Sequence, residues 1–422
     1  MSVTIVLGTQ WGDEGKGKAI DTFAGGFDYV ARFNGGNNAG HTIVNQFGTF
    51  KIHLVPSGVF YPRAKCLIGG GVVIDPAVLI EEMNSLRKAG VKLENRLFIS
   101  PRAHIILPYH KILDGLYEKA KGAGATGTTR RGIGPAYADK LSYNGLRWSD
   151  FADPDLFNQK LRIQIDLKNK IITALGDREL NFEKVRDEYL GYYAVIKPSI
   201  AELFYIVQDG LNAGKKFLLE QAMGSCLDPD WGTYPYVTGS TTLASAATGG
   251  LGIPPRAISR IIGVTKAYTT RVGAGPMPSE IKDDAQASRA LSEVAATTGR
   301  TRRAGWFDVE VANFSKQING IDRLFLTKLD ILSEMDEIRI CTGYQLNGRR
   351  VHYPDLDSYQ LGQVKPVYKI LKGWQEDIRG VHKYADLPSR ARAYVETIEK
   401  LVGVKVGWIG NGPERTAVIK KI

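Results

Sequence analysis

The chain has 422 residues, of which 43% are hydrophobic and 23% charged, a composition typical of a globular protein. No apolar run approaches the roughly 20 residues that span a bilayer, and residues 1–7 lead into a glycine loop, which argues against a membrane anchor or a signal peptide. The 55 basic residues exceed the 44 acidic ones by 11, but they are spread along the chain without a basic tail, which favours anionic small substrates over nucleic acid. Three scattered cysteines without CxxC spacing predict reduced thiols and a cytoplasmic location.

Apolar strands alternate with helical segments along the whole chain. Short β-branched or apolar runs predict buried strands at 3–7, 65–69, 216–220, 260–264, 323–327 and 404–409. Helices are predicted from Lys18, over 76–89 before Gly90, within 151–214 with an interruption at Pro198, and over 387–401. This alternation predicts an α/β fold, with a central, mostly parallel sheet flanked by helices. We expect a P-loop-like nucleotide-binding fold with loop insertions, in which residues 1–422 form a single catalytic domain.

The strongest motif is the glycine loop Gly8-Thr-Gln-Trp-Gly-Asp-Glu-Gly-Lys-Gly-Lys18, which follows the first predicted strand. Backbone N–H groups and a helix N-terminus in such a loop form a cradle for phosphate. The loop nearly matches GxxxxGK[ST], but Ala19 replaces the hydroxyl residue that usually binds Mg²⁺. Asp13 and Glu14 place carboxylates inside the loop, which is costly unless a metal or a proton-transfer role offsets the repulsion.

A second loop, Asn34-Gly-Gly-Asn-Asn-Ala-Gly-His-Thr42, ends at a histidine without apolar neighbours to bury it. His41 is therefore a candidate catalytic residue. Three further loops carry hydroxyl or guanidinium groups that suit phosphates and carboxylates, at 126–135, 234–242 and 296–303. The last of these has three arginines within four residues, which predicts an anionic partner.

The segment Thr327-Lys-Leu-Asp330 directly follows a predicted strand. A carboxylate at this point can accept hydrogen bonds from N1–H and the 2-amino group of guanine, which adenine lacks, while the Lys328 stem can cover the base. Together with the phosphate loop, this segment favours GTP over ATP.

Taken together, these segments resemble the adenylosuccinate synthetase family, from about Val3 to Thr416. The resemblance rests on QWGDEGKGK (10–18), NNAGHT (37–42), GTTRRGIGPAY (127–137), GTYPYVT (232–238), RVGAGP (271–276), TTGR (297–300), TKLD (327–330) and GPERT (412–416). It implies a GTP- and Mg²⁺-dependent ligase that joins L-aspartate to C6 of IMP through a 6-phosphoryl intermediate, giving adenylosuccinate, GDP and phosphate. The family works as a homodimer.

The resemblance also implies roles for individual residues. Asp13 would be the base, His41 the acid, and Lys16 would neutralise developing charge; Asp13 and the Gly40 carbonyl would hold Mg²⁺. The GTP-binding residues would be Gly12, Glu14, Gly15, Gly17, Lys18, Thr42, Arg302, Lys328, Asp330, Gly410, Asn411 and Gly412. The IMP-binding residues would be Asn38, Thr129, Met223, Thr238, Arg300 and, across the dimer, Tyr143. Aspartate would bind Thr297, Thr298, Gly299, Arg300 and Arg302.

Two positions depart from the family pattern. Met223 stands, in the loop expected after the 216–220 strand, where the family has a Gln that contacts the purine. Tyr143 stands where the family has an Arg that reaches the IMP phosphate across the dimer. Loss of these donors can be compensated locally, for example by Gln221, Arg147 or Arg131, or it can change the substrate. The alternative hypothesis is therefore a related ligase for another 6-oxopurine nucleotide, such as GMP or dGMP, or for another amine donor. A GTP-binding switch without ligase activity is a third possibility, and the presence of Asp13 and His41 argues against it.

Overall fold

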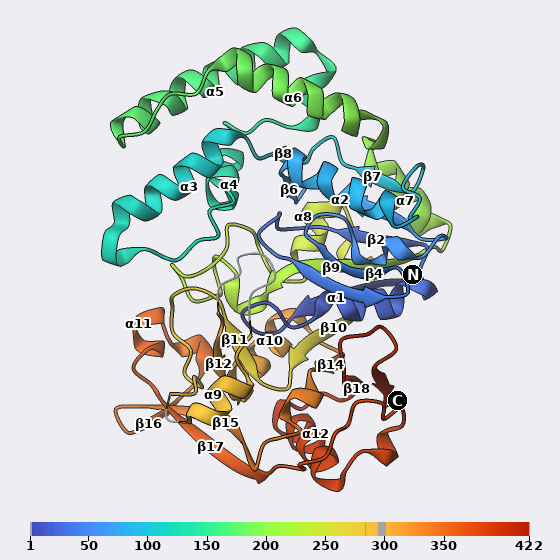
Figure 1. Ribbon diagram of the computed structural model, residues 1–422, viewed down its shortest axis with the longest axis vertical. Helices are drawn as coiled ribbons and strands as arrows, with labels where there is room; N and C mark the ends of the chain where they lie inside the picture. The colour runs from blue at the N-terminus through green and yellow to red at the C-terminus, as the bar shows by residue number, and fades with distance from the viewer. Residues whose placement is uncertain (1, 283, 294–300, 422) are drawn as a thin grey trace.

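The computed structural model describes residues 2–282, 284–293 and 301–421. Its centre is a nine-stranded sheet in the order β19-β18-β14-β10-β1-β9-β2-β5-β7 (Figure 1). The strands are β1 (Ser2–Gly8), β2 (Tyr29–Arg32), β5 (Lys65–Ile68), β7 (Leu97–Ile99), β9 (Lys216–Gly224), β10 (Ile258–Lys266), β14 (Arg323–Thr327), β18 (Val406–Gly410) and β19 (Val418–Lys420). Neighbouring strands pair in parallel, except β19, which is antiparallel to β18. The predicted central, mostly parallel sheet is confirmed.

Strand β1 lies in the middle of this sheet, between β9 and β10. Val3, Ile5, Val6 and Leu7 are all fully buried, because helices and loops cover both faces of the sheet. A continuous apolar run is what a central parallel strand requires, since neither of its faces meets water. The loop that follows β1 therefore begins at the carboxyl edge of the sheet, where α/β folds place their ligand sites.

Helices surround the sheet, and a helical layer stands beyond one side of it (Figure 1). The helices of more than one turn are α1 (Lys16–Phe23), α2 (Pro76–Lys88), α3 (Pro108–Lys121), α4 (Ile133–Leu141), α5 (Pro154–Ala174), α6 (Phe182–Ile196), α7 (Leu203–Asn212), α8 (Ala246–Leu251), α9 (Ala285–Ala290), α10 (Val309–Asn319) and α12 (Ser389–Val402), and α11 is the single turn Ser358–Leu361. In Figure 1, α5 and α6 form the outermost layer, and α6 packs against α2. The predicted helical stretch 151–214 is thus three helices, and the predicted interruption at Pro198 falls in the turn between α6 and α7.

Smaller sheets decorate the fold. A four-stranded sheet contains β13 (Phe307–Asp308), β15 (Glu337–Leu346), β16 (Arg349–Val351) and β17 (Lys365–Lys372). Pairs are formed by β3 (His41–Asn45) with β4 (Gly48–Ile52), by β6 (Val73–Ile74) with β8 (His104–Ile105), and by β11 (Thr269–Arg271) with β12 (Arg303–Gly305). Strand β3 begins at the candidate catalytic residue His41, and β12 begins at Arg303, the last residue of the predicted arginine-rich loop.

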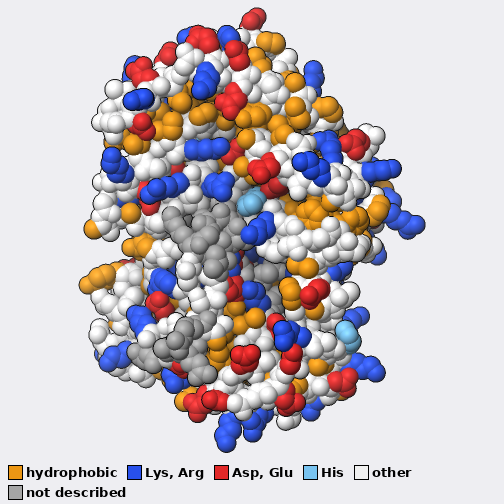
Figure 2. Space-filling model, viewed as in Figure 1, with side chains coloured by type: hydrophobic (Ala, Val, Ile, Leu, Met, Phe, Trp, Pro, Cys, Tyr) orange, Lys and Arg blue, Asp and Glu red, His pale blue; other side chains and the backbone are white. Residues whose placement is uncertain are grey.

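The surface carries its charge in a mixed pattern. Figure 2 shows basic and acidic side chains interspersed over the visible face. Within the described part of the chain, every helix is too short or too polar to cross a bilayer. The three cysteines are free and buried.

Candidate active site

The predicted phosphate loop connects β1 to α1, which begins at Lys16 rather than at Lys18. Gly15 has a φ of 89°, a left-handed conformation that glycine adopts without a steric penalty. Gly17 lies so close to the next loop that a Cβ there would stand 2.6 Å from the Cβ of His41. The two glycine-rich loops therefore pack directly on each other, as the absence of side chains at these positions allows.

The two acidic residues of the loop have opposite surroundings. Glu14 is fully buried, and its carboxylate accepts hydrogen bonds from the backbone N–H groups of Gln10 (3.0 Å) and Gly12 (2.9 Å). Lys16 Nζ donates to the other carboxylate oxygen of Glu14 at 2.6 Å. The negative charge of Glu14 is therefore balanced by donors of the loop itself and by Lys16. Asp13, by contrast, is only partly buried, with a φ of 62°, and its Oδ2 lies 2.7 Å from Nε of Arg302.

His41 is buried at the start of β3, against the expectation that its loop could not bury it. The covering groups come from distant segments: Nδ1 of His41 contacts Glu220 on β9, and Ser57 donates to the same carboxylate from its N–H (2.7 Å) and its hydroxyl (2.6 Å). Although burial by itself raises the pKa of Glu220, the contacts with His41, Arg32 and Ser57 lower it to about 2. An ionised Glu220 accepts hydrogen bonds only, so Nδ1 of His41 carries the proton.

Burial lowers the pKa of His41, and the contact with Glu220 opposes this shift. Nε2 of His41 is buried and has no hydrogen-bond partner among the described residues. With Nδ1–H directed at Glu220, Nε2 is the atom available to a ligand, and it can donate a hydrogen bond only when the ring is protonated.

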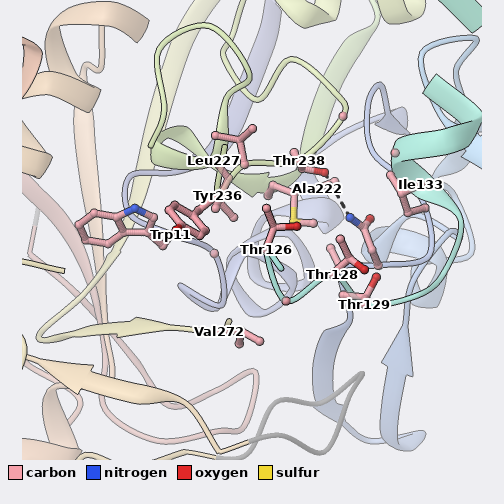
Figure 3. Close-up of a pocket in the computed structure, with 18 of the residues that line it drawn as sticks. Trp11, Thr126, Thr128, Thr129, Ile133, Ala222, Leu227, Tyr236, Thr238 and Val272 are labelled. Atoms are coloured by element: carbon pink, nitrogen blue, oxygen red, sulfur yellow. Dashed lines mark hydrogen bonds between the residues drawn. The ribbon is translucent and has the colours of Figure 1, made fainter. Parts of the chain in front are cut away.

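A first pocket, pocket A, lies between the 126–129 segment, the end of β9 and the loops at 236–239 and 271–274. Figure 3 shows Thr128, Thr129 and Ile133 at one end of it and Trp11, Tyr236 and Leu227 at the other. Two of its buried polar atoms, Oδ1 of Asn38 and Oγ1 of Thr128, have no hydrogen-bond partner among the described residues. Such groups are costly unless a ligand or water satisfies them, so pocket A suits a molecule with hydrogen-bonding groups and an apolar body.

A second pocket, pocket B, is lined by the predicted phosphate loop and by Thr42, Thr327, Lys328, Gly412, Glu293 and Arg302. Lys18 donates to the carbonyl oxygens of Gly412 and Ala417, which ties the start of α1 to the loop after β18. Burial lowers the pKa of Lys18 to about 8, with Asp330 opposing the shift. Burial has the opposite effect on the carboxyl of Asp330, whose pKa it raises. Asp330 lies just beyond β14, near Lys18 and Lys328.

The two pockets share one set of lining residues, which are Asp13, Gly40 and His41. A group transferred between ligands in pockets A and B would have to pass these three residues. A carboxylate, a backbone carbonyl and an imidazole therefore stand at the junction, which is a complete set for proton transfer and for stabilising charge.

Most predicted binding residues lie around one of the two pockets. Pocket B is lined by Gly15, Lys16, Gly17, Lys18, Thr42, Arg302, Lys328 and Gly412, and pocket A by Gly12, Asn38, Thr129, Met223 and Thr238. Glu14, Asp330, Gly410 and Asn411 line neither pocket, and the amide of Asn411 donates to Ile378 and Val381 carbonyls. Thr297, Thr298, Gly299 and Arg300 lie outside the described residues.

The two departures from the family pattern have different settings. Met223 is the penultimate residue of β9, not part of a loop, and its side chain is half-buried at pocket A. Gln221 cannot replace the missing amide, because its side chain is buried between the Gly8 N–H and the Thr242 carbonyl. Tyr143 follows α4, is 96% exposed, and lines neither pocket of its own chain.

Several site residues were not predicted from the sequence. Glu220 contacts Nδ1 of His41, and Glu293 lines pocket B. The predicted hydroxyl loop 126–135 also includes Thr128, which lines pocket A and whose buried hydroxyl has no hydrogen-bond partner among the described residues. Glu220 falls at the carboxyl end of a predicted strand, where functional residues gather in α/β folds, and this was the one available signal. Nothing in the local sequence singles out Glu293.

The residues at the junction fit Mg²⁺ that arrives with a nucleotide. Mg²⁺ is bound by one or two carboxylates together with phosphate oxygens and water. Asp13 offers a carboxylate and Gly40 a carbonyl at the point where both pockets meet. In the described part of the chain, no group of three or more His, Cys, Asp or Glu side chains could hold a metal ion by itself, so the remaining ligands would come from the substrate.

Fold and site together define an α/β protein with a P-loop-like glycine loop and two pockets that meet at Asp13, Gly40 and His41. The sequence model of the adenylosuccinate synthetase family matches residues 5–419. The chain belongs to the adenylosuccinate synthetase family. It is a GTP-dependent ligase that joins L-aspartate to IMP in purine biosynthesis.

Individual relatives agree over the full length. Adenylosuccinate synthetases of Dehalococcoides mccartyi and Parafrankia sp. are 46% identical over 424 and 427 residues, covering all of both chains. The structure of fully ligated adenylosuccinate synthetase from Plasmodium falciparum matches with a TM-score of 0.95 and 37% identity over 100% of each chain. The succinoaminodeoxyadenylate synthetase of cyanophage S-2L, bound to dGMP and dATP, shares the fold at a TM-score of 0.63 and 20% identity, over 99% of this chain and 95% of that one. The full-length relatives at 46% and 37% identity favour IMP over the alternative acceptors, whereas the cyanophage protein shows the shared fold alone.

Proposed function

We propose that pocket A binds IMP, that pocket B binds GTP, and that the γ-phosphoryl group crosses between them at Asp13, Gly40 and His41. The observation that carries this assignment is that both pockets share these three residues. Pocket B has the phosphate loop and the cations Lys16, Lys18 and Lys328, which suits a triphosphate. Pocket A has apolar walls and threonine hydroxyls, which suits a purine and a phosphate monoester.

The chemistry follows from the residues at the junction. Asp13 accepts the N1 proton of IMP, and the purine O6 attacks the γ-phosphorus of GTP. The bond between this phosphorus and the oxygen that leaves with GDP breaks at the same time. His41 in its protonated form donates from Nε2 to the transferring group, because Glu220 occupies Nδ1. Lys16, held at the helix start by Glu14, adds positive charge beside the phosphates. Bound Mg²⁺ would neutralise phosphate charge, with Asp13 and the Gly40 carbonyl among its ligands.

In the second step, the amine of L-aspartate attacks C6, and the 6-phosphate leaves. Arg302 supplies a guanidinium at the edge of pocket B for a carboxylate or phosphate. We keep Thr297, Thr298, Gly299 and Arg300 as the expected remainder of the aspartate site. A homodimer in which Tyr143 faces the IMP phosphate of the other copy is part of the same proposal, and the 96% exposure of Tyr143 supports it. The three buried free thiols support a reducing, cytoplasmic location.

Phosphate release from GTP, measured with Mg²⁺, L-aspartate and IMP and with each omitted in turn, tests the proposal. We expect release that requires all components and yields adenylosuccinate. Parallel assays with GMP and dGMP in place of IMP test the choice of acceptor. Phosphate release that does not depend on IMP and aspartate would refute the proposed ligase reaction. Release with dGMP but not with IMP would show that dGMP is the acceptor.

A further inference from the structure

Helix α3 carries a column of three buried polar side chains. His110, Asp114 and Glu118 are spaced four residues apart, so they lie on one face of the helix, and each is at most 7% exposed. All three face the segment 126–139, which includes one wall of pocket A. Buried ionisable side chains require partners, and most partners of these three lie in that segment, with Leu107 before α3 and Lys121 at its end as the others.

Glu118 makes the most contacts of the three, all with the 126–128 segment and with Lys121. Its Oε1 accepts hydrogen bonds from the hydroxyl (2.7 Å) and N–H (3.2 Å) of Thr126. Its Oε2 accepts from the N–H groups of Gly127 (2.7 Å) and Thr128 (3.1 Å). Burial alone raises the pKa of Glu118, but these hydrogen bonds outweigh it and lower the pKa to about 2, so the carboxylate stays ionised.

The other members of the column hold the far end of the same loop. Asp114 accepts a hydrogen bond from the N–H of Gly132 at 2.9 Å, directly before α4. His110 accepts at Nδ1 from the N–H of Leu107, which leaves Nε2–H to donate to Asp139 of α4 at 3.0 Å. The loop between α3 and α4 is therefore attached to α3 at both of its ends.

These contacts decide which groups of the loop are left for a ligand. Three successive backbone N–H groups, an arrangement that commonly binds phosphate, are already directed at Glu118. The hydroxyl of Thr128 is instead left without a partner among the described residues, and Thr128 and Thr129 line pocket A. Figure 3 shows both threonines at the same end of the pocket.

We propose that Glu118 is a positioning residue that fixes the 126–129 segment, so that the hydroxyls of Thr128 and Thr129, rather than the backbone N–H groups, bind the phosphate of the purine nucleotide. This inference rests on the proposed function, which assigns that nucleotide to pocket A. Glu118 does not line the pocket, so its effect on the ligand is exerted through the loop.

The test is equilibrium binding of IMP, and of its phosphate-free nucleoside inosine, to wild type, Glu118→Gln and Glu118→Ala. An amide offers only one acceptor oxygen where the carboxylate offers two, so Glu118→Gln loses part of the network and Glu118→Ala all of it. We expect IMP binding to weaken by roughly tenfold or more in Glu118→Ala and by less in Glu118→Gln. Binding of inosine and the KM for GTP are expected to stay at the wild-type values.

Glu183→Gln is the matched control, because it removes one negative charge from an exposed helical position away from the site. Equal losses of IMP, inosine and GTP binding would reduce Glu118 to a general structural role and overturn the proposal. Unchanged or tighter IMP binding in Glu118→Ala would also overturn it, since the freed N–H groups would then serve the phosphate. Failure of the wild type to bind IMP at all would instead refute the assignment of pocket A, and this inference with it.

Discussion

The Nε of Arg302 lies 2.7 Å from Oδ2 of Asp13, so the expected base is paired with an arginine expected to bind substrate. Asp13 lines both pockets, whereas Arg302 lines pocket B. Arg302 also contacts Glu293, which leaves its guanidinium surrounded by two carboxylates. On the proposed assignment, a substrate carboxylate or phosphate at Arg302 would replace these protein carboxylates, and its binding would release Asp13.

Asp13→Asn keeps the size of the side chain but removes the proton acceptor. We expect kcat to fall by at least about a hundredfold, the usual contribution of a general base. GTP binding, measured by titration calorimetry, is expected to remain within a few-fold of wild type, because Lys16, Lys18 and Lys328 are untouched. Turnover near the wild-type rate in this variant would disprove the role of Asp13 as the base.

Glu220→Gln leaves His41 without its ionised partner. We expect kcat to drop by roughly 10- to 100-fold with little change in the KM for GTP, because a neutral amide supports the protonated imidazole less well. The pH profile is informative here: the limb that reports the protonated histidine should move to lower pH. An unchanged kcat and an unchanged pH profile would show that Glu220 has a packing role only and does not support the protonated His41.

Glu293 lines pocket B and contacts three cationic side chains. Its carboxylate lies 2.7 Å from Nζ of Lys328 and 3.2 Å from Nζ of the buried Lys266, and it also contacts Arg302 and Tyr268. Although burial alone raises the pKa of Glu293, Lys266 and Lys328 hold it well below the usual range. The Glu293 carboxylate is thus paired with cationic side chains that would otherwise be free to bind a triphosphate.

For Glu293→Gln we expect the Tm without nucleotide to fall by roughly a few degrees, because three cations lose a counter-charge. GTP supplies that charge, so the rise of Tm on adding saturating GTP should be larger than in wild type. Differential scanning fluorimetry with and without GTP measures both quantities. A smaller GTP-induced rise would mean that Glu293 helps to build the GTP site instead of competing with it.

Met223→Gln restores the amide that the family has at this position. Met223 is half-buried at pocket A, and the two side chains have similar volume, so the substitution needs little repacking. We expect kcat/KM for IMP to rise several-fold, since a donor is added near the purine. Steady-state kinetics with IMP and dGMP measure the change, and a decrease with IMP would show that this pocket requires an apolar group here.

We expect Asp308 to make the stability of the fold depend on pH. Burial raises its pKa to about 7, with a hydrogen bond from the Tyr344 hydroxyl (2.7 Å) opposing the shift. A carboxyl whose pKa is raised on folding favours the protonated folded state. Its stabilising contribution is therefore full below about pH 4 and is lost as the pH rises to about 7.

Asp308→Asn is expected to flatten this dependence, because an amide does not titrate and its oxygen can still accept from the N–H of Glu310 at the start of α10. Urea unfolding at pH 5 and pH 8 should show a smaller difference in midpoint than in wild type. An equal difference in the two proteins would assign the pH dependence to other groups.

The sequence by itself determined the fold class, most of the central strands and the motifs of the family. Runs such as residues 3–7 and 323–327 are recognisable because burial on both faces of a parallel sheet requires continuous apolar residues, which is a local property. Other elements were not predicted, among them β2, α3, α10 and the four-stranded sheet that contains β15. β2 has only four residues, and it is recognisable as a strand by its pairing with β5 and β9, which the local sequence does not show.

The tertiary structure alone decided how the polar residues are used. His41 was expected to be exposed in its loop, yet it is buried, with its Nδ1 against Glu220. The two carboxylates of the phosphate loop differ because only Glu14 meets loop N–H groups and Lys16. Met223 was placed in a loop, but β9 continues to Gly224. A carboxylate or an imidazole acts through whatever stands within about 3 Å of it, and in this protein those partners come from distant segments, such as Glu220, which lies 179 residues from His41 in the chain.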